Sequence, residues 1–304
     1  MGIDNAGAKF LFAARAAGAS FRKTATLGRQ DFFPDAGVLQ RLLDLREPGR
    51  SATRFLAESG HYAEKLFEFL GAEEVVAIDN SAYEGAQVVV DMNAPIDLSL
   101  KDRFTAVFDG GCLEHVFNFP QAIRNCMELL AVGGHFIGVT PANNFCGHGF
   151  YQFSPELFFR VFSQTNGFAI RAILTMEKER WFRVMDPEQF GGRVELLNNR
   201  PTYLFVLAEK IKQREIFMEL PQQSDYARQW EKGSRGSEGA LAGSKAGRSF
   251  FRTILPAGLK ETLRPYAANL SIRHRYSCYE AINEQGILRG EFSRKAWHQM
   301  APSA

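Results

Sequence analysis

Short apolar runs alternate with segments of helical periodicity through the first two thirds of the chain. Such alternation is typical of a mostly parallel sheet with helices on both faces. The last two runs have no long helix between them, and residues 198–201 before the second run are turn-forming, which predicts an antiparallel hairpin at one edge. We therefore predict an α/β fold with a doubly wound, mostly parallel, Rossmann-like sheet of seven strands and an antiparallel edge strand. The expected strands are 23–27, 75–78, 86–90, 104–108, 135–139, 169–176 and 202–208.

Helical periodicity and capping residues predict the helices between these strands. The expected helices are 37–45, 62–70, 120–130 and 155–162, the last with Ser154 as its N-cap and Pro155 at its first position. We interpret the first 20 residues as a short amphipathic helix that caps the domain. The predicted organisation is an N-terminal helix in 1–23, one α/β domain over 24–211, and a basic, mainly helical or irregular extension over 212–304.

Composition narrows the class of protein further. The 304 residues carry a formal net charge of +2, so bulk charge gives no reason to expect a nucleic-acid partner. The four cysteines show no C-x-x-C spacing, which favours reduced thiols and no metal site. No apolar stretch approaches the ~20 residues of a spanning helix, and the N-terminus lacks the pattern of a signal peptide. We expect a cytoplasmic protein.

Glycine and acidic residues stand at the ends of the first four predicted strands: Gly28, Asp79, Asp91 and Asp109. In open α/β sheets, ligands bind at the carboxyl ends of the strands. Glycine lets the backbone approach a ligand, and a carboxylate can accept hydrogen bonds from ribose hydroxyls. A single aspartate there is more simply a turn or helix cap. Three at successive strand ends favour a binding site.

Several segments together resemble S-adenosylmethionine-dependent methyltransferases of class I. Segment 104–116, Phe-Thr-Ala-Val-Phe-Asp-Gly-Gly-Cys-Leu-Glu-His-Val, resembles the fourth-strand segment of that family. Segment 129–137 resembles its leucine, proline-glycine-glycine and apolar-strand signature, with Val132 in place of proline. His148, followed by 153–157 and 166–168, resembles the later part of the same domain.

The resemblance covers about residues 24–208 and implies the fold, the cofactor and the residues that contact it. The cofactor is S-adenosylmethionine. The implied contacts are Gly28 beneath the cofactor, Asp79 at the ribose, Asp91 with Met92 at the adenine, and Asp109, Gly110 and Gly111 beside the methionine moiety. The implied reaction is methyl transfer to an oxygen or nitrogen of a small molecule or glycan.

Methyl transfer from a sulfonium needs in-line placement and removal of the acceptor's proton. His115 and His148 are the histidines near the expected cleft, and imidazole can take a proton at neutral pH. His115 has an alternative role as an anchor of a helix start. His148 lies in the glycine-flanked aromatic loop 143–151, which we predict to be a substrate lid.

The first glycine-rich loop departs from the family pattern. Only Gly28 remains, and Arg29 and Gln30 stand where glycines are usual. An alternative hypothesis is therefore a binding or scaffold protein that kept the fold and lost catalysis. A nicotinamide-dependent oxidoreductase is a weaker alternative, because no G-x-G-x-x-G follows the first strand.

The C-terminal third contains a basic stretch. Nine lysines and arginines against two glutamates give residues 232–275 a local charge of +7. Segments 250–256 and 259–263 mix apolar and basic residues, a pattern that can make a weak peripheral contact with an anionic membrane or pack back on the domain. The same charge would attract an acidic substrate.

Overall fold

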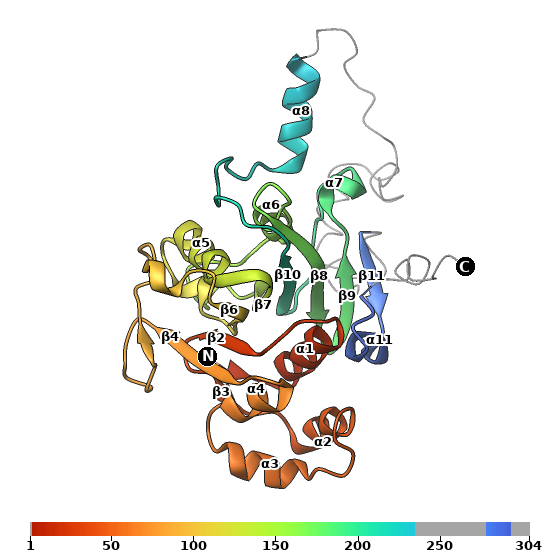
Figure 1. Ribbon diagram of the computed structural model, residues 1–304. Helices are drawn as coiled ribbons and strands as arrows, with labels where there is room; N and C mark the ends of the chain where they lie inside the picture. The colour runs from red at the N-terminus through yellow and green to blue at the C-terminus, as the bar shows by residue number, and fades with distance from the viewer. Residues whose placement is uncertain (1, 235–277, 293–304) are drawn as a thin grey trace, which may run out of the picture.

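A mixed sheet of nine strands organises the part of the chain that the computed structural model describes, residues 2–234 and 278–292. Its order is β11-β9-β8-β10-β7-β6-β2-β4-β5 (Figure 1). The five strands from β7 to β5 are parallel, whereas β10 is antiparallel to both β7 and β8. The strands are β2 (Lys23–Leu27), β4 (Glu74–Asp79), β5 (Val88–Val89), β6 (Phe104–Asp109), β7 (Leu130–Asn143), β8 (Phe168–Glu177), β9 (Arg180–Val184), β10 (Thr202–Lys210) and β11 (Tyr279–Ile282).

This sheet confirms the predicted α/β class, with a largely parallel centre and antiparallel pairing at one edge. The predicted number of seven strands is wrong because the sheet contains two further strands, β9 and β11. β9 follows β8 through Lys178 and Glu179, which adopt positive φ (47° and 59°) although neither is a typical turn residue. β11 pairs with β9 from far along the sequence, beyond residue 211.

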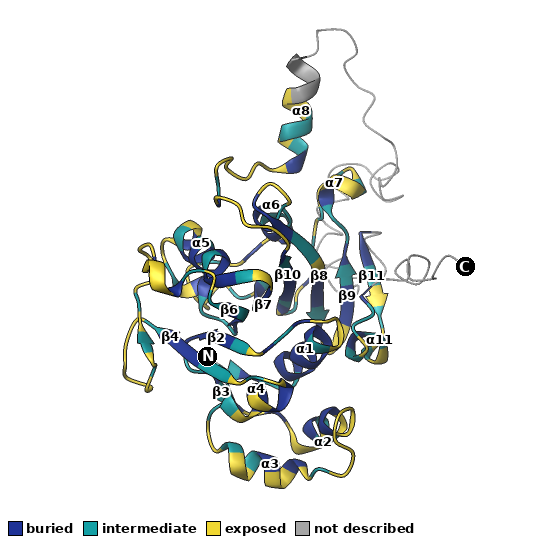
Figure 2. Cartoon of the chain, viewed as in Figure 1, coloured by how far each residue is buried: buried dark blue, intermediate teal, exposed yellow. Residues whose placement is uncertain are grey.

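Helices cover both faces of the sheet, so that two hydrophobic cores lie on either side of it. One face carries α5 (Phe119–Leu129) and α6 (Pro155–Val161). The other carries α1 (Asn5–Ala16), α2 (Ala36–Asp44), α3 (Ala52–Ser59), α4 (Glu64–Leu70) and α11 (Glu284–Leu288). Figure 2 shows buried residues concentrated along the sheet, with exposed ones on the outer turns of α2 and α3. Short helices α7 (Pro187–Phe190), η1 (Leu98–Leu100) and η2 (Leu113–His115), and the helix α8 (Ser224–Ser234), complete the described elements.

Helix α1 is not the amphipathic cap that the sequence predicted. Residues 6–14 are all buried. Phe10 packs edge-on against Phe205 of β10, with 5.2 Å between the ring centroids. The Lys9 ammonium lies 2.8 Å from a Glu284 carboxylate oxygen at the start of α11. The helix is therefore enclosed between the sheet and the C-terminal helix, which removes the exposed face that a cap would have.

The segment between β2 and α4 contains more regular structure than expected. Helix α3, which the sequence analysis did not predict, begins after Ser51, whose hydroxyl accepts a hydrogen bond from the Arg54 amide at 3.3 Å and so acts as the N-cap. Strand β3 (Asp31–Phe32) pairs in parallel with β1 (Gly2–Ile3). This pairing brings the N-terminus beside the end of β2.

Two hypotheses from the sequence concern membranes: a peripheral contact through the basic stretch, and the absence of a spanning helix. Segments 250–256 and 259–263, with most of the basic stretch, lie outside the described residues. Within the described residues, no helix has both the length and the apolar character to cross a bilayer.

The parallel strands align so that their carboxyl ends share one edge. Leu27 is in register with Asp109 of β6, and Asp109 with Gly138 of β7. β7 continues for five residues past that point to Asn143, which pairs with Thr202 at the start of β10. The loops that follow β2, β6 and β7 therefore meet above the same edge.

Candidate functional site

A cavity of about 370 Å³ opens at this edge, above the ends of β6 and β7. The loop after β6 supplies Gly110, Gly111, Glu114 and His115 to its wall, and the loop after β7 supplies His148. The N-terminal segment, β3 and β10 contribute Asp4, Asp31 and Tyr203 among others. Four residues predicted from the sequence (Gly110, Gly111, His115 and His148) are thus brought together.

Asp109 builds the loop that follows β6. Its side chain is 1% exposed, and its carboxylate accepts hydrogen bonds from the amides of Cys112 (2.8 Å) and Leu113 (3.4 Å). These bonds start the short helix η2, which carries Glu114 and His115. Burial, followed by the charge of Glu114, raises the pKa of Asp109 to about 8. Asp109 shapes the site from below, and it is not part of the cavity wall.

Glu114 is a site residue that the sequence analysis missed. Its side chain is 1% exposed, and its carboxylate has long contacts with two other side chains. One oxygen lies 3.4 Å from Nε2 of His148, and the other accepts a hydrogen bond from the Thr140 hydroxyl at 3.3 Å. Burial raises the pKa of Glu114 to about 7. A glutamate between Leu113 and His115 in a largely apolar segment was the available signal, because buried carboxylates need a partner.

The backbone of Glu114 also holds the loop that carries His148. Its carbonyl accepts hydrogen bonds from the amides of Phe150 (2.8 Å) and Tyr151 (3.2 Å). Gly149 makes this approach possible: its φ is +72°, and a Cβ there would lie 2.8 Å from the Glu114 carbonyl oxygen. The rings of His115 and His148 consequently lie 5.0 Å apart. Burial and the neighbouring His148 lower the pKa of His115.

The residues expected to hold the nucleoside part of a cofactor lie outside this cavity. Gly28 is buried, and its amide donates to the Ile78 carbonyl at 2.7 Å. Asp79 is half-buried at the end of β4. Asp91 is exposed and accepts hydrogen bonds from the backbone and side chain of Asn93, both at 2.8 Å. Met92 is buried in the core beside α5. These four residues lie at or after the ends of β2, β4 and β5 at the same edge of the sheet, and none of them lines the 370 Å³ cavity.

The side chains of Arg29 and Gln30 lie at the carboxyl end of β2, where specific contacts hold them. Arg29 forms an ion pair with Glu64 at 2.6 Å, and its guanidinium lies 3.7 Å above the centre of the Tyr62 ring. Gln30 is 2% exposed, and its amide nitrogen donates to the Leu27 carbonyl at 2.7 Å.

The Gln30 side chain also faces the loop after β6. Its Oε1 has no hydrogen-bond partner among the described residues. The same oxygen would lie 2.2 Å from a Cβ at Gly110. A buried acceptor without a partner next to a glycine is the kind of position where a ligand donor fits.

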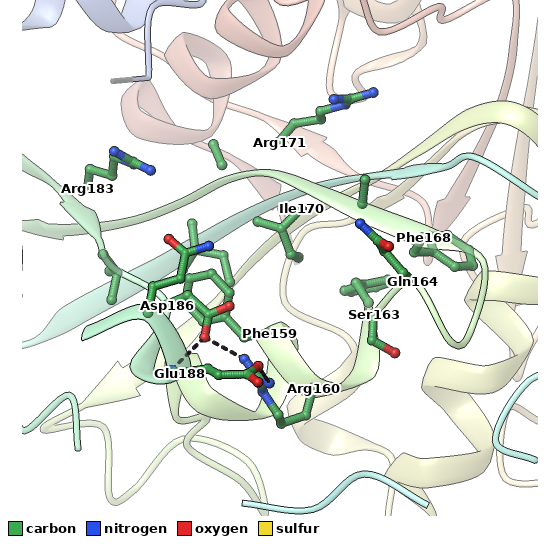
Figure 3. Close-up of a pocket in the computed structure, with 16 residues that line it drawn as sticks. Phe159, Arg160, Ser163, Gln164, Phe168, Ile170, Arg171, Arg183, Asp186 and Glu188 are labelled. Atoms are coloured by element: carbon green, nitrogen blue, oxygen red, sulfur yellow. Dashed lines mark hydrogen bonds and ion pairs between the residues drawn. The ribbon is translucent and has the colours of Figure 1, made fainter. Parts of the chain in front are cut away.

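A second hollow, of about 430 Å³, lies between α6, β8, β9 and α7 (Figure 3). Figure 3 shows Arg160 directed at Asp186 and Glu188, and these contacts are ion pairs. Arg171 and Arg183 lie on the strands on the other side of the hollow. None of the residues predicted from the sequence lines it.

Comparisons with known proteins give likenesses of structure only. No family model matches the sequence, and no curated protein matches it. The YcgJ protein from Bacillus subtilis is 10% identical, covers 67% of this chain and 99% of that one, and has a TM-score of 0.36.

Two further structures bear names that state a methyltransferase and its ligand. The trans-methyltransferase CalH complex with SAH is 12% identical, covers 66% of this chain and 54% of that one, and has a TM-score of 0.36. Geranyl diphosphate methyltransferase in complex with SAM is 13% identical, covers 68% and 85%, and has a TM-score of 0.35. The likeness is one of fold, and it decides neither ligand nor reaction.

Gly149→Ala tests the contact that holds the His148 loop. An added Cβ would meet the Glu114 carbonyl at a φ that disfavours alanine, a strain of about 1–3 kcal/mol. We expect the amides of Phe150 and Tyr151 to exchange about ten- to a hundredfold faster, as measured by hydrogen exchange with NMR detection. Gly147→Ala is the matched control, since a Cβ at Gly147 meets nothing within 4 Å. Equal exchange in the two variants would contradict this account.

Asp109→Asn tests the burial of an acid beneath the loop. Because the folded-state pKa (about 8) exceeds the ordinary 3.8, the folded protein holds a proton that the unfolded chain releases. Stability from this group is complete below pH 4 and declines as pH rises towards 8, by on the order of 1 kcal/mol per pH unit. The free energy of unfolding of the wild type, relative to Asp109→Asn, should fall over that window in urea titrations. A constant difference from pH 5 to pH 8 would show that Asp109 is ionised throughout.

Proposed function

We propose that the protein transfers the methyl group of S-adenosylmethionine to an oxygen or nitrogen of a small molecule or glycan bound in the 370 Å³ cavity. One observation carries the proposal. Asp109 and Glu114 are buried at the carboxyl edge of the parallel strands, and neither forms an ion pair with a lysine or arginine of the described residues. Without a compensating charge, burial raises the pKa of both groups and favours their protonated forms, and a cation bound beside them would stabilise the ionised carboxylates. S-adenosylmethionine brings two positive groups, its sulfonium and its ammonium.

The cofactor would lie along the strand ends from β4 to β6. In this proposal Asp79 binds the ribose hydroxyls, Asp91 and Met92 border the adenine, and Gly28 lies beneath. Gly110 and Gly111 would flank the methionine moiety once the Gln30 side chain has moved from above Gly110.

Gln30 makes up for the glycines that the first loop lacks. Its unpartnered Oε1 faces Gly110 and can accept a hydrogen bond from the ammonium group of the cofactor. Asp109, just beneath, would add charge attraction once that group is bound. The proposal therefore requires the side chain of Gln30 to shift, because it now fills the space above Gly110.

The acceptor would be activated by the two imidazoles. His148, held near Glu114, receives the proton of the acceptor's hydroxyl or amine, and His115 lies beside it. The loop that carries His148 is tied to Glu114 and would position the acceptor for in-line transfer. We propose a cytoplasmic location for this activity.

A binding or scaffold protein is the second candidate. The observation in its favour is that Arg29 and Gln30 are held by specific contacts over the end of β2. Such a protein would keep the fold and bind no S-adenosylmethionine. Calorimetric titration of the full chain with S-adenosylmethionine, S-adenosylhomocysteine and NAD separates the possibilities. The proposal expects the first two to bind and NAD to give no signal; silence from all three would leave the scaffold hypothesis.

Asp79→Ala tests the placement of the ribose. Removal of two charge-assisted hydrogen bonds should weaken S-adenosylhomocysteine binding by about 2–4 kcal/mol. Asp97→Ala is the control, because Asp97 is an exposed aspartate that only caps a short helix, accepting from the Ser99 amide at 2.8 Å. Binding of Asp79→Ala within twofold of the wild type would remove Asp79 from the cofactor site.

A further inference from the structure

Glu114, His115 and His148 form a cluster of three groups with lone pairs. One ligand atom from each lies within 4.8 Å of the other two. The Glu114 carboxylate and Nε2 of His148 are already 3.4 Å apart. All three residues belong to the cavity wall, and they come from two loops that hydrogen bonds tie together.

The spacing suits a metal ion with little rearrangement. An ion bound at about 2.0–2.2 Å from nitrogen and oxygen ligands separates them by roughly 3–3.5 Å. One pair of the cluster meets this separation. The other two separations would shorten to this range if the exposed side chains of His115 and His148 rotated. Glu114 would stay in place, because its side chain is buried.

The electrostatics of Glu114 favour a cation at this position. Its carboxylate is removed from water, and its contacts to Thr140 and His148 are 3.3 Å and 3.4 Å long. No lysine or arginine of the described residues lies within ion-pair distance of it. Ordinary charge-assisted hydrogen bonds are 2.7–2.9 Å long. A divalent cation would supply the charge that the surrounding protein lacks.

We propose that Glu114, His115 and His148 bind a divalent transition-metal ion of the Zn²⁺ type. Two imidazoles and one carboxylate are a common ligand set for such ions. Three protein ligands leave at least one coordination position open, and here it faces the cavity. This site corrects the expectation of no metal, which rested on the spacing of the cysteines, because the cluster contains no cysteine.

The role of the ion rests on the proposed function. A hydroxyl of the acceptor takes the open position, and the ion lowers the pKa of that hydroxyl, so that its proton passes to solvent. The oxygen lone pair then forms the bond to the methyl carbon as the carbon–sulfur bond breaks, which leaves S-adenosylhomocysteine. With the ion bound, the imidazoles are ligands, and the ion replaces His148 as the activating group. The acceptor class is accordingly a hydroxyl compound.

Metal binding by the full chain, stripped of metal beforehand, tests the site directly. We expect Zn²⁺ titration calorimetry to detect a site whose affinity falls at least tenfold in each of Glu114→Gln, His115→Ala and His148→Ala. Co²⁺ should give a visible absorption band that the same variants lose. The control is His61→Ala, because the His61 imidazole is exposed and is not part of the cavity wall. It contacts a carboxylate, that of Asp31, at 2.9 Å. Because His115 and His148 are exposed, we expect their variants to fold. Their Zn²⁺ affinities therefore test the site even if Glu114→Gln does not fold.

Wild-type Zn²⁺ affinity in both histidine variants would overturn the metal site. The two proposals also fail separately. Zn²⁺ binding that depends on the cluster, without any binding of S-adenosylhomocysteine, would keep the metal site and overturn methyl transfer. S-adenosylhomocysteine binding without Zn²⁺ binding would overturn the metal site and leave the proposed methyl transfer in place.

Discussion

The hydrogen bonds that the Glu114 carbonyl accepts from the amides of Phe150 and Tyr151 are the constraint on which the site depends. They join the loop after β6 to the loop after β7, which otherwise belong to separate strands. Gly149 permits the approach, and the side chain of the same Glu114 faces His148. The buried residue Glu114 thus holds the loop after β7 through its backbone carbonyl and contacts the imidazole of that loop through its carboxylate.

Much of the framework could be predicted from the sequence, because apolar runs of strand length ended in polar residues. Asp109, Gly110 and Gly111 lie together at the end of β6 as this pattern implied, and His115 lies near His148. The rest depended on contacts that no local pattern encodes. Glu114 is important only because folding buries it, and β9 follows a turn formed by Lys178 and Glu179.

The altered first loop changes how a cofactor would be held. Where glycines would leave open space, Arg29 is anchored to Glu64, and Gln30 fills the space above Gly110. The loss of space is accompanied by an unpartnered acceptor on Gln30 and by two buried carboxylates nearby. A cation bound at this edge of the sheet would stabilise the ionised forms of these carboxylates, whose pKa values burial raises, but the steric space there is short. Gln30 contributes to both, because its side chain occupies the space above Gly110 and its Oε1 is the acceptor without a partner.

A crystal structure of the full chain grown with S-adenosylhomocysteine tests the central claim most directly. The account predicts the ribose of the ligand at Asp79, its methionine moiety at Gly110, and the Gln30 side chain moved from its present position. A structure in which Gln30 keeps its place and no ligand lies between Asp79 and Gly110, under saturating S-adenosylhomocysteine, would contradict it.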